Sequence, residues 1–183
     1  RAALGGKGGG TRPGFIAEDQ AGRKFLVKFD FAANPDQQTG TGVVANRIFW
    51  TIGFNVPGEY WVDVHRETDI EIDSEAELKD DLGRKRPMSD DDVDAMFATA
   101  PQRPDGTHRL FVSELLEGVP IGGASPEGRR PDDPNDTVPH EHRRELRGMR
   151  VFAAWLGHTD IKEDNTLDMY VTEGDRHFVR HYL

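Results

Sequence analysis

The sequence contains no cysteine, which excludes disulfide bonds, zinc sites built on thiolates and cysteine nucleophiles. It also contains no run of about 18 apolar residues, so no helix is expected to cross a membrane. No signal peptide is recognisable. The chain begins with Arg1 instead of methionine, and we therefore expect the native N-terminus, with any targeting signal, to lie before it.

Acidic residues are concentrated between residues 67 and 94. That stretch holds twelve acidic and four basic residues, so it carries a charge of −8 out of the net −10 of the chain. The remainder of the sequence is close to neutral. Because nucleic acids are polyanions, we do not expect this acidic region to bind them.

The length of 183 residues suits one domain or two small lobes around a cleft. Two kinds of hydrophobic periodicity occur along the sequence. Alternating apolar residues predict strands, and apolar residues three and four apart predict helices, so we expect an α+β fold. A glycine-rich stretch, 1–14, comes first. The expected elements are a hairpin over 15–29, a helix over 42–52, strands over 59–64 and 68–72, a polar loop over 80–88, a helix capped by Ser89, a strand over 110–116, a loop over 124–138, a helix from Pro139 to residue 156 ended by Gly157, a polar loop over 158–165 and a hairpin over 167–183.

The polar loop after the long helix carries the strongest functional signal. His158, Asp160, Lys162 and Asn165 have the spacing of the protein-kinase catalytic loop, His-Arg-Asp-x-Lys-x-x-Asn, with Thr159 in place of the arginine. This resemblance implies that Asp160 orients the acceptor hydroxyl and takes its proton, that Lys162 neutralises charge on the transferred phosphoryl group, and that Asn165 binds Mg²⁺. A solvated loop that happens to hold charged residues is the alternative.

Lys28 lies in the predicted strand that follows the glycine-rich stretch. In protein kinases, a lysine in such a strand contacts the α- and β-phosphates of ATP. Glycines let backbone N–H groups approach phosphates closely, and Gly8, Gly9 and Gly10 are the candidates here. Their spacing is not the Gly-x-Gly-x-x-Gly of protein kinases, so a surface lysine behind a flexible glycine segment is the alternative.

A third candidate is the segment 111–118, which includes Glu114. It resembles the connector between the two lobes of a kinase, whose backbone hydrogen-bonds the adenine of the nucleotide. An ordinary strand is the alternative, because apolar segments of this kind are common.

Three segments together, 13–30, 53–57 and 144–160, resemble a group of bacterial proteins with an atypical kinase-like fold. That group is distantly similar to HipA-like and spore-coat (CotH-like) kinases. The resemblance implies a bilobal protein-kinase-like fold, with a β-rich N-lobe over 1–110, a hinge-like connector over 111–118 and the first part of a helical C-lobe over 119–183. It also implies a phosphotransferase that depends on ATP and Mg²⁺. The sequence names neither the phosphate acceptor nor the compartment, which could be the bacterial cytoplasm or the cell envelope.

Two departures from the kinase pattern favour a different hypothesis, a pseudokinase or an interaction module within a larger assembly. The predicted helix over 42–52 has no acidic residue to pair with Lys28, and Gly42 stands where the glutamate is expected. Glu59, the nearest acidic residue that could replace the glutamate, lies beyond the helix and is a poor substitute. The strand at 178–183 resembles the one before an Asp-Phe-Gly metal motif, but the sequence has no such motif. We therefore expect a fragment, or a chain completed by further residues or a protein partner.

Two pairs of histidines could suggest a metal site. His140 and His142, two positions apart at a helix start, do not share a helix face. His177 and His181 share one side of a strand, but no third ligand is evident. The sequence therefore does not favour a histidine metal site.

Overall fold

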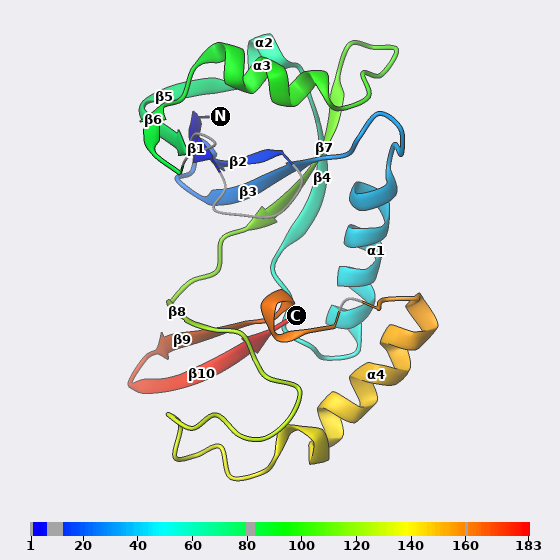
Figure 1. Cartoon of the computed structure of the whole chain (residues 1–183), viewed down its shortest axis with the longest axis vertical. Helices are drawn as coiled ribbons and strands as arrows, with labels where there is room; N and C mark the ends of the chain where they lie inside the picture. The colour runs from blue at the N-terminus through cyan, green and yellow to red at the C-terminus, as the bar shows by residue number, and fades with distance from the viewer. Residues whose placement is uncertain (1, 7–12, 80–82, 160) are drawn as a thin grey trace. The chain divides into compact units, whose positions relative to one another are not determined.

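A computed structural model of the protein describes residues 2–6, 13–79, 83–159 and 161–183. These residues form an α+β fold with a seven-stranded mixed sheet, a three-stranded antiparallel sheet and four α-helices. The chain divides into two compact units, Arg1–Asn46 with Gly58–Leu115 and Arg47–Pro57 with Leu116–Leu183. Figure 1 labels the elements of both units.

The first unit is built around the seven-stranded sheet, in the order β4-β7-β3-β2-β1-β5-β6. All neighbouring strands are antiparallel except β1 and β5, which are parallel. Its strands are β1 (Ala2–Gly6), β2 (Gly14–Glu18), β3 (Lys24–Phe29), β4 (Glu59–Val64), β5 (Glu71–Lys79), β6 (Lys85–Pro87) and β7 (His108–Glu114); its helices are α1 (Gln37–Thr51), which continues into the second unit from residue 47, α2 (Arg66–Asp69) and α3 (Asp90–Ala98).

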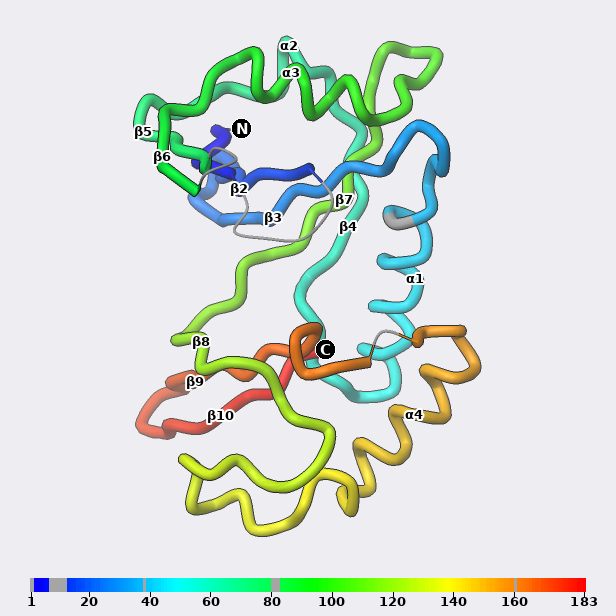
Figure 2. Tube along the Cα trace, in the orientation of Figure 1, coloured from blue at the N-terminus to red at the C-terminus, as the bar shows by residue number. Residues whose placement is uncertain are grey.

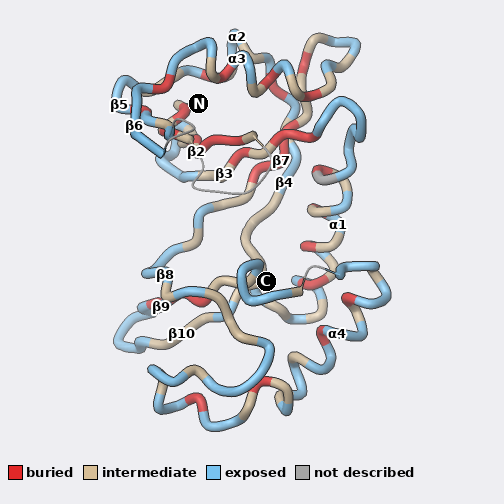
Figure 3. Tube along the Cα trace, in the orientation of Figure 1, coloured by how far each residue is buried: buried red, intermediate tan, exposed pale blue. Residues whose placement is uncertain are grey.

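One face of this sheet forms the core of the first unit. Every second residue of β3, including Val27 and Phe29, points to that face, where α3 contributes Val93 and Phe97. The Phe29 and Phe97 rings meet edge to face at 5.0 Å. In Figure 3 the buried residues gather along β2, β3 and β7. The opposite face of β3 carries Lys28.

Local sequence signals account for several elements. The β2–β3 hairpin around 18–22 is confirmed, with Phe15 opposite Val27. The Ser89 cap of α3 is also confirmed: its hydroxyl accepts the Asp92 N–H, and the Asp92 carboxylate accepts the Ser89 N–H at 2.9 Å.

Two other predicted boundaries were wrong. Helix α1 begins at Gln37 rather than 42, because the buried Asp30 carboxylate accepts hydrogen bonds from the N–H and hydroxyl of Thr39, at 3.2 and 2.6 Å. Residues 68–72 do not form one strand. Instead α2 ends at Asp69, whose carboxylate accepts the His65 N–H at 2.7 Å, and β5 follows.

Two further segments gain structure that the sequence did not predict. Part of the glycine-rich stretch forms β1, where Gly5 and Gly6 allow close contact with β5; a Cβ on Gly5 would lie 2.7 Å from the Glu77 carbonyl oxygen. Part of the predicted polar loop over 80–88 forms the short strand β6, which pairs with β5.

The second unit combines the end of α1, a three-stranded sheet in the order β10-β9-β8, and one long helix. Its elements are β8 (Val119–Gly122), the 3₁₀ turn η1 (His140–His142), α4 (Arg144–Leu156), the 3₁₀ turn η2 (Glu163–Asn165), β9 (Leu167–Glu173) and β10 (Arg176–Tyr182). The predicted C-terminal hairpin is confirmed, and Gly174 turns it with a φ of 58°. The predicted helix from Pro139 is interrupted at Arg143, whose backbone is extended, so the α-helix itself starts at Arg144.

The core of the second unit is small. Phe49 from α1 and Met149 and Ala153 from α4 are its buried members, and half-buried residues such as Phe54 and Phe152 surround them. The Phe49 and Phe54 rings contact edge to face. Gly118, with a φ of +103°, lies against β9, where a Cβ would come within 2.5 Å of the Tyr170 carbonyl oxygen.

Candidate functional site

Lys28 lies on the face of the first sheet opposite the core. In β3 it is paired with Gly14 of β2 and Phe111 of β7, and the alternation along the strands places Ile16, Leu26 and Ser113 on the same side. We call this surface, defined by Ile16, Leu26, Lys28, Phe111 and Ser113, the Lys28 face. Phe111 is buried and the other four are half-buried. The Lys28 ammonium, a group that can pair with phosphate, therefore lies among half-buried and buried apolar side chains.

Helix α1 approaches the Lys28 face through Gly42. A Cβ at that position would lie 3.0 Å from Cε2 of Phe111, so the missing side chain is what allows this approach. The Lys28 ammonium lies 5.6 Å from the centre of the same ring, within the range of a cation–π contact. Among the described residues, no carboxylate forms an ion pair with Lys28. The sequence predicted that this helix has no acidic residue. At Gly42, where a kinase would have the glutamate, α1 packs against the Phe111 ring of β7.

Glu114 does not join the Lys28 face. It is paired with Phe25 across the strands, so its side chain lies on the same side of the sheet as the core. There it lines a cavity of about 310 Å³ together with Phe25, Val27 and Tyr60. Its backbone N–H donates to the Gly58 carbonyl oxygen at 2.8 Å. The side chains of Glu114 and Lys28 therefore lie on opposite sides of the sheet, and the backbone role of segment 111–118 stays a prediction.

The catalytic-loop-like segment lies in the second unit, between α4 and β9. Gly157 ends α4 in the left-handed conformation with a φ of 65°, as expected, and the His158 N–H donates to the Ala153 carbonyl oxygen at 2.8 Å. Figure 2 shows the chain turning back from α4 toward β9 through η2. Lys162 and Asn165 lie at the two ends of this turn, both exposed, and the Asn165 N–H donates to the Lys162 carbonyl oxygen at 2.9 Å.

The segment is held by residues that follow β8. The Ala124 N–H donates to the Thr166 hydroxyl at 2.8 Å. Gly123 touches the turn so closely that a Cβ there would lie 2.1 Å from the Glu163 carbonyl oxygen. These contacts fix the backbone that carries Lys162 and Asn165. Asp160, Gly8, Gly9 and Gly10 lie outside the described residues.

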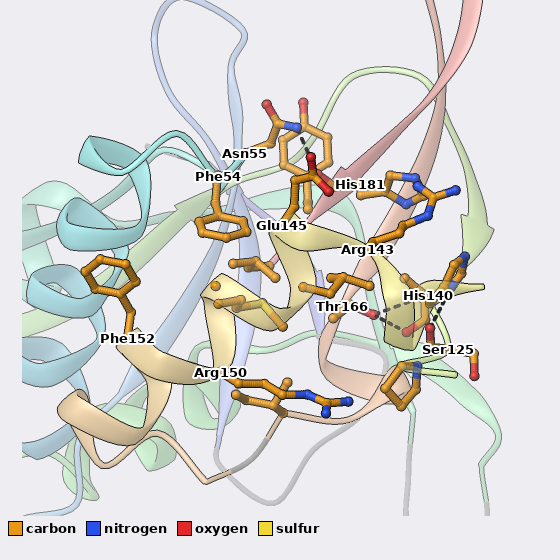
Figure 4. A pocket seen from close by; sticks show the side chains of 18 of the residues that line it. Phe54, Asn55, Ser125, His140, Arg143, Glu145, Arg150, Phe152, Thr166 and His181 are labelled. Atoms are coloured by element: carbon orange, nitrogen blue, oxygen red, sulfur yellow. Dashed lines mark hydrogen bonds between the residues drawn. The ribbon is translucent and has the colours of Figure 1, made fainter. Parts of the chain in front are cut away.

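The segment borders a cavity of about 680 Å³ within the second unit. Figure 4 shows Phe54 and Phe152 on one side of it and His140, Arg143 and His181 on the other. Lys162 and Thr166 also line it. A volume of this size is typical of ligand sites, and its lining separates into an apolar part and a polar part.

Two buried carboxylates organise the polar part of this unit, and the sequence analysis missed both. Asp168 on β9 is 1% exposed. Its carboxylate accepts one hydrogen bond from the Arg130 guanidinium and one from Nδ1 of His181, each at 2.6 Å. Burial raises the pKa of the Asp168 carboxyl, but His181 and Arg130 outweigh that effect and the pKa is lowered. Asp168 therefore stays ionised and holds His181 at the edge of the cavity.

The second carboxylate, Asp136, precedes η1. Its carboxylate accepts hydrogen bonds from the backbone N–H of Arg130 at 2.6 Å, from Nε2 of His140 at 2.8 Å and from the Arg143 guanidinium. Nδ1 of His140 contacts the Ser125 carbonyl oxygen. In the sequence, the only signal for this cluster was an aspartate four residues before a histidine in a segment otherwise typical of a loop.

Asp136 should make the second unit sensitive to acid. Burial raises the pKa of its carboxyl, but the hydrogen bonds from Arg130 and His140 and the charge of Arg143 lower it to about 2. Since the unfolded-state pKa is about 3.9, the native state gains about 2 kcal/mol from this group, fully present above about pH 4 and lost as the pH falls through about 2. Urea unfolding measured from pH 5 to pH 2 should show a shallower loss of stability in Asp136→Asn than in the native protein. Asp175→Asn, in the exposed β9–β10 turn, should leave the native slope unchanged.

Possible metal ligands were compared among the residues that the structure describes. They contain no group of three or more histidine, aspartate or glutamate side chains arranged to hold a metal ion. Mg²⁺ in nucleotide sites usually takes one or two protein oxygens and otherwise phosphate oxygens and water. The exposed Asn165 amide fits the role of one such ligand.

No protein-family model matches the chain, and no curated protein matches it either. In the described part of the chain, no helix has the length and apolar character needed to cross a membrane.

Proposed function

We propose that this chain is a kinase-like phosphotransferase that uses Mg²⁺ and ATP, with a bilobal protein-kinase-like fold. One observation carries the proposal: the segment 158–165, which has kinase catalytic-loop spacing, runs from the glycine-ended helix α4 into an antiparallel hairpin, β9–β10. Lys28 supports it from the first unit, because it lies half-buried beside apolar side chains in a strand paired with β2 and β7.

The proposed roles follow the resemblance residue by residue. Lys28 pairs with the nucleotide phosphates, and backbone N–H groups of Gly8, Gly9 and Gly10 approach them. Asp160 orients the acceptor hydroxyl and takes its proton, and Lys162 neutralises charge on the transferred group. Asn165 supplies a metal ligand. Bound Mg²⁺ and ATP supply the transferable phosphoryl group.

A second candidate, a pseudokinase, is favoured by the contact between Gly42 and Phe111. A glutamate at position 42 would have to displace the Phe111 ring, so the lysine–glutamate pair of active kinases has no counterpart at this place. In this alternative, the chain binds nucleotide or a partner protein and does not transfer phosphate.

Nucleotide binding tests the proposal. Mg²⁺ with ATP at a hundred times the dissociation constant should stabilise the chain by about 2.7 kcal/mol, because the ligand binds only the folded state. Replacing Lys28 by methionine should weaken binding roughly tenfold, since a charge-assisted contact to phosphate is lost. Calorimetric titration and thermal unfolding measure both effects.

The matched control is Lys24→Met, in the same strand and exposed. Equal binding by the native protein and by both variants would argue against a nucleotide site at Lys28. Binding without phosphate transfer would select the pseudokinase.

A further inference from the structure

Helices cover one end of the core-side face of the first sheet. Phe97 of α3 contacts His108, the first residue of β7, with ring centres 5.2 Å apart. Helix α2 begins just after β4 ends, so it lies at the same end of these two antiparallel strands. Figure 1 shows α2 and α3 beside the start of β7. At the opposite end, around Tyr60 and Glu114, the face opens into the cavity of about 310 Å³, which we call the Glu114 cavity.

The floor of the Glu114 cavity is apolar and broad. Its side chains come from the three neighbouring strands β3, β7 and β4, and they are Phe25, Val27, Leu110, Val112, Tyr60 and Val62. Neighbouring strands lie about 4.8 Å apart, so a floor of three strands is roughly 10 Å across. A flat aromatic ring covers a floor of this width, whereas a single alkyl chain leaves much of it exposed to water.

The charges on this cavity do not balance. Its charged lining residues are Glu18, Asp19, Arg23 and Glu114. The Arg23 guanidinium donates from Nε to the Asp19 carboxylate at 2.9 Å and lies 5.5 Å from the centre of the Phe25 ring, so Arg23 and Asp19 neutralise each other. Alternation along β2 turns the Glu18 side chain to the other side of the sheet. The Glu114 carboxylate therefore leaves one net negative charge on the side of the floor.

The Glu114 carboxylate lies at the edge of the floor, and no described side chain donates a hydrogen bond to it. Nη1 of Arg23 is 3.8 Å from its Oε1, which exceeds hydrogen-bond length. A Cβ on Gly58 would lie 2.5 Å from Oε2 of Glu114 and 3.1 Å from the Tyr60 hydroxyl oxygen, so the glycine leaves room for both groups beside one another. Both oxygens can accept hydrogen bonds from one ammonium group, and the Tyr60 ring can add a cation–π contact.

We propose that the Glu114 cavity binds a small aromatic amine, with the ammonium group at the Glu114 carboxylate and the ring on the apolar floor. The ammonium donates to Glu114 and to the Tyr60 hydroxyl. A lysine side chain of a partner protein is a poorer occupant, because its single alkyl chain leaves much of the floor uncovered. An anionic ligand is also poorer, since Glu114 would repel it. The proposal does not depend on nucleotide binding, because Lys28 lies on the opposite side of the sheet.

The probes that test the proposal are phenethylamine, its neutral isostere phenethyl alcohol, the anion hydrocinnamate and the lysine analogue Nα-acetyllysine methylamide. Each is titrated into the ¹⁵N-labelled chain, and the amide chemical shifts give both the site and the dissociation constant. Phenethylamine should shift the amides of Val27, Val62 and Val112. Phenethyl alcohol should bind at least roughly tenfold more weakly, because it has no charge to pair with Glu114, and hydrocinnamate should cause no shifts there.

Glu114→Gln should weaken phenethylamine binding by at least roughly tenfold and leave phenethyl alcohol binding within about twofold, because it removes the charge and keeps the shape of the side chain. The Glu114 side chain is 34% exposed, so the circular dichroism spectrum should not change. The matched control is Glu75→Gln, which removes an exposed carboxylate of β5 outside the cavity and should bind phenethylamine like the native chain.

Equal binding of phenethylamine and phenethyl alcohol would overturn the proposal, as would unchanged phenethylamine binding by Glu114→Gln. Absence of shifts at these amides in roughly 20 mM phenethylamine would do the same, because that concentration exceeds the weakest dissociation constant expected of a ligand of this size. Tighter binding of Nα-acetyllysine methylamide than of phenethylamine would assign the cavity to a lysine side chain instead.

Discussion

Replacing Asp168 by alanine is expected to destabilise the second unit by roughly 3–5 kcal/mol, because it leaves a largely buried cation without its buried partner. The Arg130 side chain is 14% exposed and donates to the Asp168 carboxylate at 2.6 Å, while His181 donates from Nδ1 to the other oxygen. Domain stabilities of about 5–15 kcal/mol mean that such a loss brings the unit close to unfolding. Urea unfolding followed by circular dichroism measures the change.

The matched control for this prediction is Asp132→Ala. Asp132 also lies beside Arg130, at 3.2 Å from Nε, but its side chain is 69% exposed. Exposed ion pairs contribute about 0–1 kcal/mol, so the expected loss is small. If both variants lost the same stability, burial of the Asp168 cluster would not be the cause.

Replacing Asp160 by asparagine is expected to reduce phosphate transfer by about 10²–10⁴-fold, the usual contribution of a positioned general base. The substitution keeps the size of the side chain and removes the group proposed to take the proton of the acceptor hydroxyl. Transfer from γ-labelled ATP to the chain itself and to generic protein acceptors measures the effect. Nucleotide binding should be retained, because the role proposed for Asp160 concerns the acceptor.

Asp164→Asn is the control for this loss. Asp164 lies in η2, is exposed, and undergoes the same change of charge and shape. Its transfer activity should stay within about twofold of the native chain, as expected of a surface charge change that touches no reacting group. Native activity in the Asp160 variant would remove the catalytic-loop interpretation of the segment.

The elements that could be predicted are those whose signals are local. The β9–β10 hairpin follows from alternating residues around a Glu-Gly-Asp turn, and the end of α4 follows from Gly157. The start of α3 follows from Ser89 and the acidic residues after it. In each case, the residues that determine the boundary lie within a few positions of it.

The elements that could not be predicted depend on partners distant in sequence. Helix α1 includes Gly40 and Gly42, although glycine disfavours a helix. The Asp30 carboxylate accepts a hydrogen bond from Thr39 in its first turn, and Gly42 packs against the Phe111 ring. The burial of Asp168 depends on Arg130, 38 residues earlier, which donates a hydrogen bond to its carboxylate. Such tertiary contacts leave no periodic pattern in the sequence.

The candidate site was predictable in part. Sequence spacing correctly placed Lys28 in a strand of a β-hairpin and the 158–165 segment between a helix and a hairpin. It did not reveal that Glu114 points to the other side of the sheet from Lys28, because that depends on the pairing of β3 with β7. The nucleotide roles of Lys28, Lys162 and Asn165 stay predictions.

The most direct test of the central claim is a titration of the ¹⁵N-labelled chain with Mg²⁺ and ATP, followed by amide chemical shifts. We expect shifts centred on Ile16, Leu26 and Lys28, which Lys28→Met weakens and Lys24→Met preserves. Absence of shifts on the Lys28 face at saturating nucleotide, or the same shifts in the Lys28 variant, would contradict it.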